Sequence, residues 1–258
     1  MTFVISTYKD VYVYLINLER SPERLAQITK QLVTLQVPFE RVVAFDASKE
    51  DLSLCQIDRQ VFAKVHGRSR IRDAEIGCYQ SHFAVLNRFV KSDKKFAVVF
   101  EDDIQISEGL NGILDQLQAW SDDWDIVPLF HWHRGTPMQI KNSGSFSLNV
   151  FLTAVTSSAA YVVNQHAANV LLTHMKVQSA CVDHELFNTA THGLRLRGIT
   201  PKCISLSEQA NVSTIGASNP NSDLKPSFWN RIPTLIYRSR YAIFRLFHGL
   251  FIAVKLRL

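Results

Sequence analysis

Residues 94–104 read KKFAVVFEDDI, and this stretch decides the fold. Five consecutive apolar residues run directly into three consecutive acids, Glu101, Asp102 and Asp103. A short apolar run that is rich in β-branched and aromatic residues and bounded by charge predicts a buried central strand. Open α/β sheets place their ligand crevice at the carboxyl ends of the strands, so we expect the three acids at such a crevice.

The three adjacent acids indicate a cation site. Neighbouring carboxylates repel one another, so a site that keeps all of them ionised usually supplies a cation. A ligand set made only of oxygen suits Mg²⁺ or Mn²⁺, metals that commonly bridge protein carboxylates to substrate phosphates. Residues 94–104 alone leave an alternative open, a solvated acidic turn after an edge strand.

The composition predicts an ordinary globular protein with an uneven charge. The chain has 258 residues, 47% hydrophobic and 20% charged, which suits one domain with room for an appendage. Residues 226–258 hold six Arg or Lys and no acid, which leaves 22 basic against 23 acidic residues in 1–225. We therefore predict a near-neutral main domain over 1–225 and a basic segment over 226–258. The chain has neither a Gly-rich phosphate loop nor a CxxC pair, which disfavours P-loop, Rossmann and zinc sites.

The N-terminal part predicts a first β-α-β unit. Residues 11–18, VYVYLINL, are typical of a strand, and residues 41–45 form the next one. Between them, Ser21 as N-cap and Pro22 at the first helical position begin a helix that runs to about Val37.

Two arginines mark the start of this helix. Arg20 and Arg24 are four residues apart, so they share one face at a helix N-terminus, where anions are favoured. They are candidates for holding phosphate. The alternative is that they pair with Glu19 or Glu23.

The rest of the chain continues the alternation of strands and helices, which predicts an α/β fold with a mainly parallel central sheet. Residues 46–73 are weakly periodic and predict a connecting region at the rim of a binding site. The aromatic turn 130–135 would stack on a sugar or base, or else form a covered loop. Helices are predicted at 75–91, 110–120, 167–175 and from 181, and strands at 124–129, 146–163 and 195–204.

Taken together, the motifs resemble glycosyltransferase family 25, the family of bacterial lipopolysaccharide and lipooligosaccharide galactosyltransferases, which is related to the collagen galactosyltransferases. The resemblance covers about residues 11–205 and departs from the family at Ala74, His166 and Cys181, the last of these just before a candidate catalytic acid. The matching segments, in chain order, are 17–24 (NLERSPER), 75–82 (EIGCYQSH), 100–104 (FEDDI), Trp124-Asp125, 160–163 (AYVV), and Val182-Asp183 with Leu186.

The resemblance implies a GT-A-like nucleotide-sugar-binding fold and a metal-dependent transfer of galactose from UDP-galactose to a lipid-linked oligosaccharide. Inversion would give a β-linkage, with 1,4 among the linkages left open. Mn²⁺ or Mg²⁺ would stabilise the leaving diphosphate. The implied metal ligand is Asp103, with Asp102 as a second ligand or a ribose partner. The base for the acceptor hydroxyl is Asp183, with Glu185 as the alternative. The implied donor-binding residues are Asn17, Arg20, Arg24, Glu75, His82, Glu101 and Asp102.

The C-terminal segment lies outside the resemblance and predicts membrane association. Residues 235–256 are expected to be helical, and four basic residues recur at or near seven-residue spacing: Arg231, Arg238, Arg245 and Lys255. A basic stripe on an otherwise apolar helix is typical of a helix lying in an anionic membrane surface. The alternative is a packed C-terminal helix whose arginines reach solvent. Nucleic acid is not an expected partner, because the body offers no basic groove.

Two other functions compete with this interpretation. A metal-dependent phosphohydrolase would need a second carboxylate cluster, which the sequence does not offer. A non-catalytic, membrane-bound carbohydrate-binding protein would tolerate the loss of Asp103. The N-terminal residues lack the features of a secretory signal, so we expect a cytoplasmic protein, peripheral on the cytoplasmic face of the inner membrane.

Overall fold

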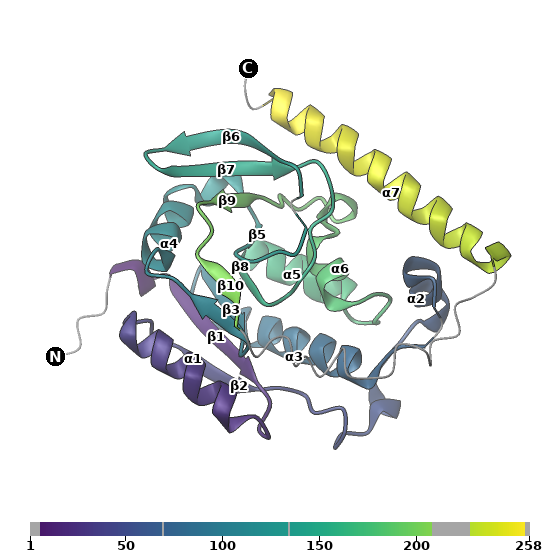
Figure 1. Cartoon of the computed structure of the whole chain (residues 1–258), viewed down its shortest axis with the longest axis horizontal. Helices are drawn as coiled ribbons and strands as arrows, with labels where there is room; N and C mark the ends of the chain where they lie inside the picture. The colour runs from purple at the N-terminus through teal and green to yellow at the C-terminus, as the bar shows by residue number, and fades with distance from the viewer. Residues whose placement is uncertain (1–5, 69, 134, 208–227, 256–258) are drawn as a thin grey trace.

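A five-stranded sheet organises the computed structural model, which describes residues 6–68, 70–133, 135–207 and 228–255. The strand order is β2-β1-β3-β8-β5 (Figure 1). Strand β1 pairs in parallel with β2 and β3, whereas β8 is antiparallel to both β3 and β5. All strands but β8 therefore point one way, which confirms the predicted mainly parallel sheet. The strands are β1 (Val11–Asn17), β2 (Glu40–Val43), β3 (Phe96–Glu101), β5 (Ile126–Pro128) and β8 (Ala160–Asn164).

The predicted central strand is β3, whose residues 96–100 are all buried. Successive side chains of a strand point to opposite faces of a sheet. Phe96, Val98 and Phe100 accordingly join one hydrophobic cluster, and Ala97 and Val99 join the other. With cores on both faces and strands on both sides, this segment has no solvent-facing residue until its carboxyl end.

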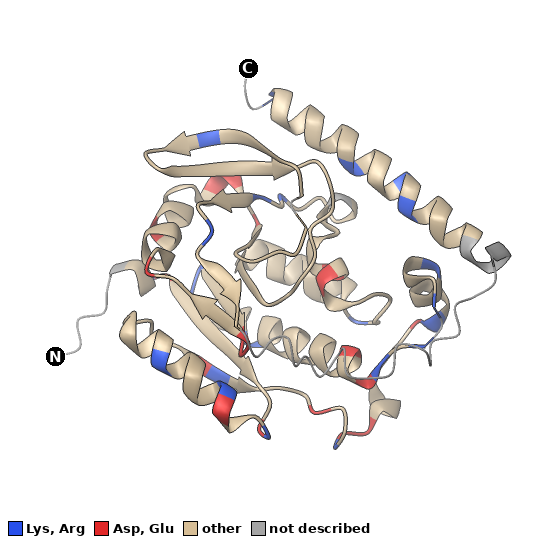
Figure 2. Ribbon diagram, viewed as in Figure 1, with Lys and Arg blue, Asp and Glu red and all other residues tan. Residues whose placement is uncertain are grey.

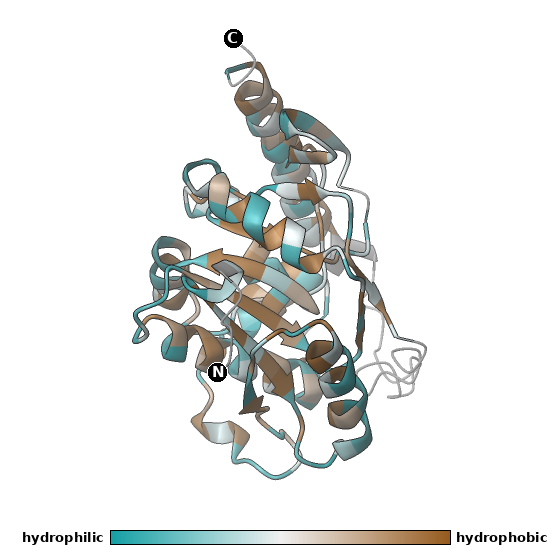
Figure 3. Cartoon of the chain, turned by 90° about the vertical axis from the view of Figure 1, so that its left-hand side faces the viewer, coloured by the Kyte–Doolittle hydropathy of each residue, from teal (hydrophilic) through white to brown (hydrophobic). Residues whose placement is uncertain are grey.

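Helices cover both faces of the sheet and complete a three-layer α/β/α architecture (Figure 3). One layer holds α1 (Pro22–Thr34) and α4 (Leu110–Ala119), and the other holds α3 (Asp73–Phe89), α5 (Gln165–His174) and α6 (Val182–Phe187). In α1 the residues Ile28 and Leu32 are one turn apart and fully buried against the sheet. The first β-α-β unit is confirmed, although its helix ends at Thr34.

Smaller elements surround this core. Region 46–73, predicted as a connecting region, contains α2, and the predicted strand region 146–163 divides between two sheets. Strand β6 was not predicted, because it is largely exposed and polar and so lacks an apolar alternation. The additional strands are β4 (Ile104–Ile106) with β10 (Ile204–Leu206), and β6 (Pro137–Ser143) with β7 (Phe146–Phe151) and β9 (Gly198–Thr200). The additional helical segments are α2 (Arg59–His66) and four single turns, at Ser6–Tyr8, Leu52–Leu54, Ser121–Asp123 and Thr189–Thr191.

The C-terminal segment forms one helix, α7 (Phe228–Lys255), which contains Pro233 and contacts α2, β6 and β7. It lies along one side of the molecule (Figure 1). At Gly249 a Cβ atom would lie 2.9 Å from the Cδ2 methyl of Leu152 and 3.2 Å from the carbonyl oxygen of Phe151, so glycine suits this close approach. The predicted domain boundary at 225/226 and the prolines Pro220 and Pro226 lie outside the described residues.

Two of the four residues of the predicted basic stripe of α7, Arg238 and Arg245, are engaged by the body of the protein, whereas Lys255 is exposed. Arg238 donates to the carbonyl oxygens of Val65 and His66, and Arg245 is buried and donates to the carbonyl of Phe187. Along α7, Figure 2 shows Lys and Arg positions in blue and no Asp or Glu position in red. The outward face is apolar instead, with the exposed residues Ile236, Ile243, Phe247, Phe251 and Val254. Within the described chain, no helix combines the length and hydrophobicity needed to span a membrane.

Candidate active site

Glu101 ends β3, and Asp102 and Asp103 form the tight turn to β4, beside a cavity of about 270 Å³ that we call the acid cleft. The cleft opens at the carboxyl ends of β1, β2 and β3, where a parallel sheet is expected to bind its ligand. Seven residues that the sequence singled out line it together: Asn17, Arg20, Arg24, His82, Glu101, Asp102 and Asp103.

Asp102 is held in place by residues from the first β-α unit. The amide of Asn17, the last residue of β1, donates to Asp102 Oδ2 over 2.6 Å. Arg24, in the first turn of α1, donates to Asp102 Oδ1 over 3.2 Å. Burial raises the pKa of Asp102, and Asn17 and Arg24 oppose that shift by hydrogen bonding and charge. The Asn17 and Arg24 motif therefore fixes the second acid of the triplet.

Asp103 is the least compensated of the three acids. Its Oδ1 atom is buried and has no hydrogen-bond partner among the described residues, and its Oδ2 lies 3.8 Å from Arg24 Nη1. Burial, together with the charges of Glu101 and Asp102, raises the pKa of Asp103 to about 6. A buried, unpartnered carboxylate oxygen among like charges is the arrangement that a hard divalent cation stabilises, so the residues fit such an ion.

Glu101 belongs to a buried hydrogen-bond network. His82 Nε2 lies 3.1 Å from Glu101 Oε1, and the hydroxyl of Ser158 donates to the same oxygen over 2.6 Å. The other ring nitrogen of His82 lies 3.1 Å from the hydroxyl of Tyr161. Burial disfavours the Glu101 charge, but His82, Ser158 and Arg24 outweigh it, so the pKa of Glu101 is lowered. Ser158 was not predicted, because a serine in a small-residue loop carries no periodic signal.

The rim of the cleft is built by the loop after β2. Arg20 pairs with Asp46 and donates to the hydroxyl of Ser48 over 2.9 Å, so the predicted alternative partners Glu19 and Glu23 are wrong for it. Arg20 keeps 44% of its side chain exposed at the cleft. A Cβ on Gly77 would lie 2.7 Å from the carbonyl of Phe45, so glycine is needed for this loop to lie against α3.

A second cavity of about 290 Å³ shares Glu101 and Asp103 with the acid cleft and reaches Asp183, and we call it the Asp183 cavity. Asp183 lies in the first turn of α6, where its Oδ2 accepts from the backbone N–H of Ser157 over 3.1 Å. Ser157 adopts a φ of +101°, a left-handed conformation that costs a non-glycine residue about 1–3 kcal/mol. Exposed Trp132, from the aromatic turn, also lines this cavity.

Two predicted site residues point elsewhere. Glu185 accepts from the hydroxyl of Ser179 over 2.7 Å and lines a larger cavity beside α7, which we call the α7 cavity. Glu75 lies at the edge of the Asp183 cavity, where it pairs with Arg68 at 2.5 Å and accepts from the backbone N–H of Arg72. Of the two candidate bases, Asp183 alone therefore lines the cavity that Asp103 also lines.

Cys78, His82 and Glu101 also bring ligand-type atoms within 4.8 Å of one another. A thiol and an imidazole would suit Zn²⁺ rather than Mg²⁺. His82 and Glu101 already lie within hydrogen-bond distance of each other, and burial raises the pKa of Cys78 well above its usual range. These groups are satisfied as they stand, whereas Asp103 is not.

The fold and the site define an α/β domain with an acidic, cation-compatible cleft at the carboxyl end of its central strand. Residues 11–186, which are 176 of the 258, match the sequence model of glycosyltransferase family 25, described as an LPS biosynthesis protein. The chain belongs to this glycosyltransferase family. The match begins with β1 and ends within α6, so it includes both the acid turn and Asp183.

Three curated relatives are similar to parts of the chain. A "Putative glycosyltransferase" of Haemophilus influenzae strain Rd is 28% identical over 188 residues, 69% of this chain and 64% of the relative. "Lipooligosaccharide biosynthesis protein lic2B" of Haemophilus influenzae is 27% identical over 111 residues, 43% of this chain and 38% of the relative. "Procollagen galactosyltransferase 1" of Danio rerio is 24% identical over 126 residues, 45% of this chain and 20% of the relative. The chain spans less than two thirds of the length of each.

Proposed function

We propose that this chain is a GT-A-like, metal-dependent galactosyltransferase that moves galactose from UDP-galactose to a lipid-linked oligosaccharide with inversion. Family membership and the names of the relatives support galactosyl transfer in surface-glycan synthesis. The observation that carries the proposal is the place of Asp103, which lines both the acid cleft and the Asp183 cavity. A sugar that is transferred from a donor in one cavity to an acceptor in the other has to pass the residues that both cavities share.

In this proposal the donor lies in the acid cleft. Asp103, with Asp102 beside it, would hold Mn²⁺ or Mg²⁺, which supplies Lewis-acid stabilisation of the charge that develops on the leaving diphosphate. Arg20 is exposed at the cleft and offers a further cation toward phosphate. The cation of Arg24 lies near both Asp102 and Asp103 and offsets part of the repulsion between their carboxylates before the donor binds.

The acceptor lies in the Asp183 cavity. Both oxygens of Asp183 accept backbone N–H groups, from Ser157 and His184, so the carboxylate is oriented before the acceptor arrives. Such a carboxylate can take the proton from an acceptor hydroxyl as the new bond forms. Trp132 is 65% exposed at this cavity and offers an aromatic face for a sugar ring. A base on one side and a leaving group on the other favour a single inverting displacement.

We also propose that α7 holds the protein on an anionic membrane, the cytoplasmic leaflet in the cell. Its outward residues Ile236, Ile243 and Phe247 are spaced to share one helix face, and the exposed Arg240 and Lys255 lie beside that face. Burial of apolar surface would then contribute more than charge, because Arg238 and Arg245 are engaged by the body.

The experiment that tests this function measures UDP release by purified protein from a panel of UDP-sugars with Mn²⁺, with and without lipooligosaccharide acceptor. Transfer predicts release from UDP-galactose that rises at least tenfold with acceptor. Release that ignores the acceptor would instead indicate the phosphohydrolase alternative. Binding without release would indicate a carbohydrate-binding protein. Asp103→Asn in the same assay is the matched control for the metal site.

A further inference from the structure

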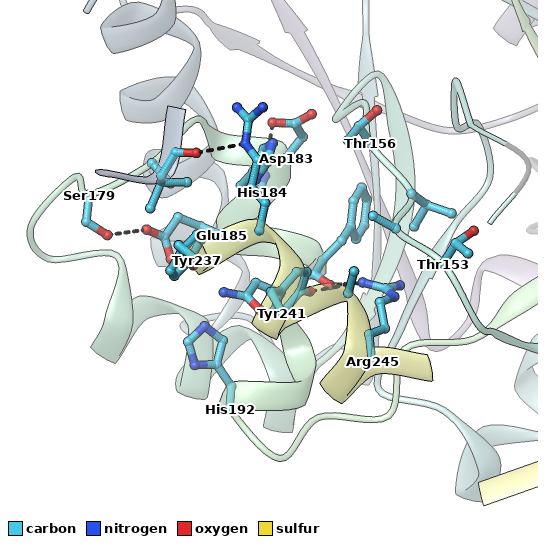
Figure 4. A pocket seen from close by; sticks show the side chains of 18 of the residues that line it. Thr153, Thr156, Ser179, Asp183, His184, Glu185, His192, Tyr237, Tyr241 and Arg245 are labelled. Atoms are coloured by element: carbon cyan, nitrogen blue, oxygen red, sulfur yellow. Dashed lines mark hydrogen bonds between the residues drawn. The ribbon is translucent and has the colours of Figure 1, made fainter. Parts of the chain in front are cut away.

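Apart from Asp183, no residue that lines the α7 cavity also lines the acid cleft or the Asp183 cavity. At about 640 Å³ it is more than twice the size of the acid cleft or the Asp183 cavity, and it lies between α7, α2, α6 and the loop 152–156 (Figure 4). Most of the surface of its wall is apolar, contributed by aliphatic and aromatic side chains, which is unusual for a pocket that holds only sugar. The aliphatic residues include Val61, Val65, Leu152, Val155, Ala180 and Leu246.

The cavity connects the candidate base to the outer face of α7. Asp183 lines both this cavity and the Asp183 cavity, so the two adjoin at the proposed acceptor hydroxyl. On α7, Ile243 and Leu246 line the same cavity while remaining 56% and 40% exposed. A long molecule held in this cavity would therefore run from the apolar face of α7 toward Asp183.

The cavity also contains a buried cation. Arg245 is 6% exposed, donates to the carbonyl of Phe187 and the hydroxyl of Tyr241, and has no carboxylate within salt-bridge distance in the described part of the chain. Its Nε atom is buried and lacks a hydrogen-bond partner there, as does His192 Nε2 (Figure 4). A buried arginine without an anion costs free energy that an anionic ligand would recover.

Resting on the proposed function, we propose that the α7 cavity binds the lipid part of the acceptor, an aliphatic chain that carries an anionic phosphate. The chain lies along the aliphatic wall, and the phosphate accepts hydrogen bonds from Arg245. The lipid class fits all three observations at once: an apolar wall, an uncompensated cation, and continuity with the face that meets the membrane. The C-terminal helix is then a wall of the acceptor site as well as an anchor.

The test uses the full chain and n-decyl phosphate below its micelle-forming concentration, with binding measured by calorimetry. We expect decyl phosphate to bind at least tenfold more tightly than n-butyl phosphate, which lacks most of the chain, and than n-decyl maltoside, which lacks the anion. Equal affinities for all three probes would overturn the proposal.

Variants locate the binding. Ala242→Trp and Ala154→Trp fill the cavity from two different walls, and each is expected to weaken decyl phosphate binding at least tenfold. Ser239→Trp, on the same helix but outside the cavity lining, should change it less than twofold. If one of these two cavity-filling variants fails to fold, decyl phosphate binding by the other one tests the cavity assignment. Undiminished binding by a folded filling variant would overturn the cavity assignment.

The outcome is separable from that of the proposed function. If wild-type protein releases UDP from no sugar nucleotide but binds decyl phosphate with this pattern, the galactosyltransferase proposal fails and the lipid cavity remains. If transfer occurs and decyl phosphate binding is absent or ignores the filling variants, the lipid cavity fails and the enzyme remains.

Discussion

Replacing Asp103 with asparagine should make the metal-free protein more stable while removing the metal site. Asp103 is 18% exposed, and burial, together with the charges of Glu101 and Asp102, raises its pKa from 3.8 to about 6. A pKa that is about two above its ordinary value means that keeping Asp103 ionised lowers the free energy of unfolding by at most about 3 kcal/mol. Asparagine has nearly the same shape and no charge, so it removes that repulsion.

The sign of the pH dependence follows from the raised pKa. Between pH 3.8 and about 6 the folded protein keeps a proton that the unfolded chain has released, so stability falls as the pH rises through this window. Without metal, Asp103→Asn should therefore exceed wild type in free energy of unfolding by about 1–3 kcal/mol at pH 7.5. The difference should shrink to about a third of that value at pH 4.5.

The assay is thermal unfolding in chelator and in Mn²⁺, at both pH values. For a chain of this size, 1 kcal/mol moves Tm by about 2–4 °C, so the expected gain in chelator is several degrees. Mn²⁺ should raise the Tm of wild type and leave that of the variant unchanged. Two results would refute the reasoning: a variant less stable than wild type at pH 7.5 without metal, or equal protection of both proteins by Mn²⁺.

Three further predictions concern the acceptor side and the membrane. Asp183→Asn should lower kcat at least a hundredfold and leave the affinity for UDP-galactose within about threefold of wild type, whereas Glu185→Gln should keep most of its turnover. Calorimetry measures the donor affinity and initial rates measure kcat, so together they separate an effect on catalysis from an effect on binding. Trp132→Ala should raise the acceptor KM about tenfold and leave donor affinity unchanged, and a shift in donor affinity instead would assign this ring to the nucleotide. Phe247→Glu combined with Phe251→Glu should abolish sedimentation with anionic liposomes while activity on a soluble acceptor persists; sedimentation equal to wild type would remove α7 from the membrane contact.

Much of the architecture could be predicted from local sequence. Residues 96–100 form the central strand because a buried parallel strand needs apolar side chains on both faces, and few other local structures do. Helix α1 begins where Pro22 fixes its first φ angle. The acid turn follows from the same stretch, because its carboxylates come directly after the buried residues.

The rest depends on contacts that local patterns do not specify. The reversed direction of β8 is set by its pairing with β3 and β5, and no local pattern records a strand's direction. Asp183 and Glu185 are two residues apart on α6, so sequence shows that they face differently but not which one faces Asp103. Helix α7 has a clear apolar face, but that face turns outward because the cations find backbone carbonyls on α2 and α6.

The central claim is tested most directly by initial rates of transfer to purified lipooligosaccharide acceptor from UDP-galactose, UDP-glucose and UDP-N-acetylglucosamine, with Mn²⁺ or with chelator. The account predicts a kcat/KM for UDP-galactose at least tenfold above that of either other donor, a β-linked product by proton NMR, and loss of transfer in chelator that added Mn²⁺ restores. Equal use of the three donors, an α-linked product, or full activity in chelator would contradict it.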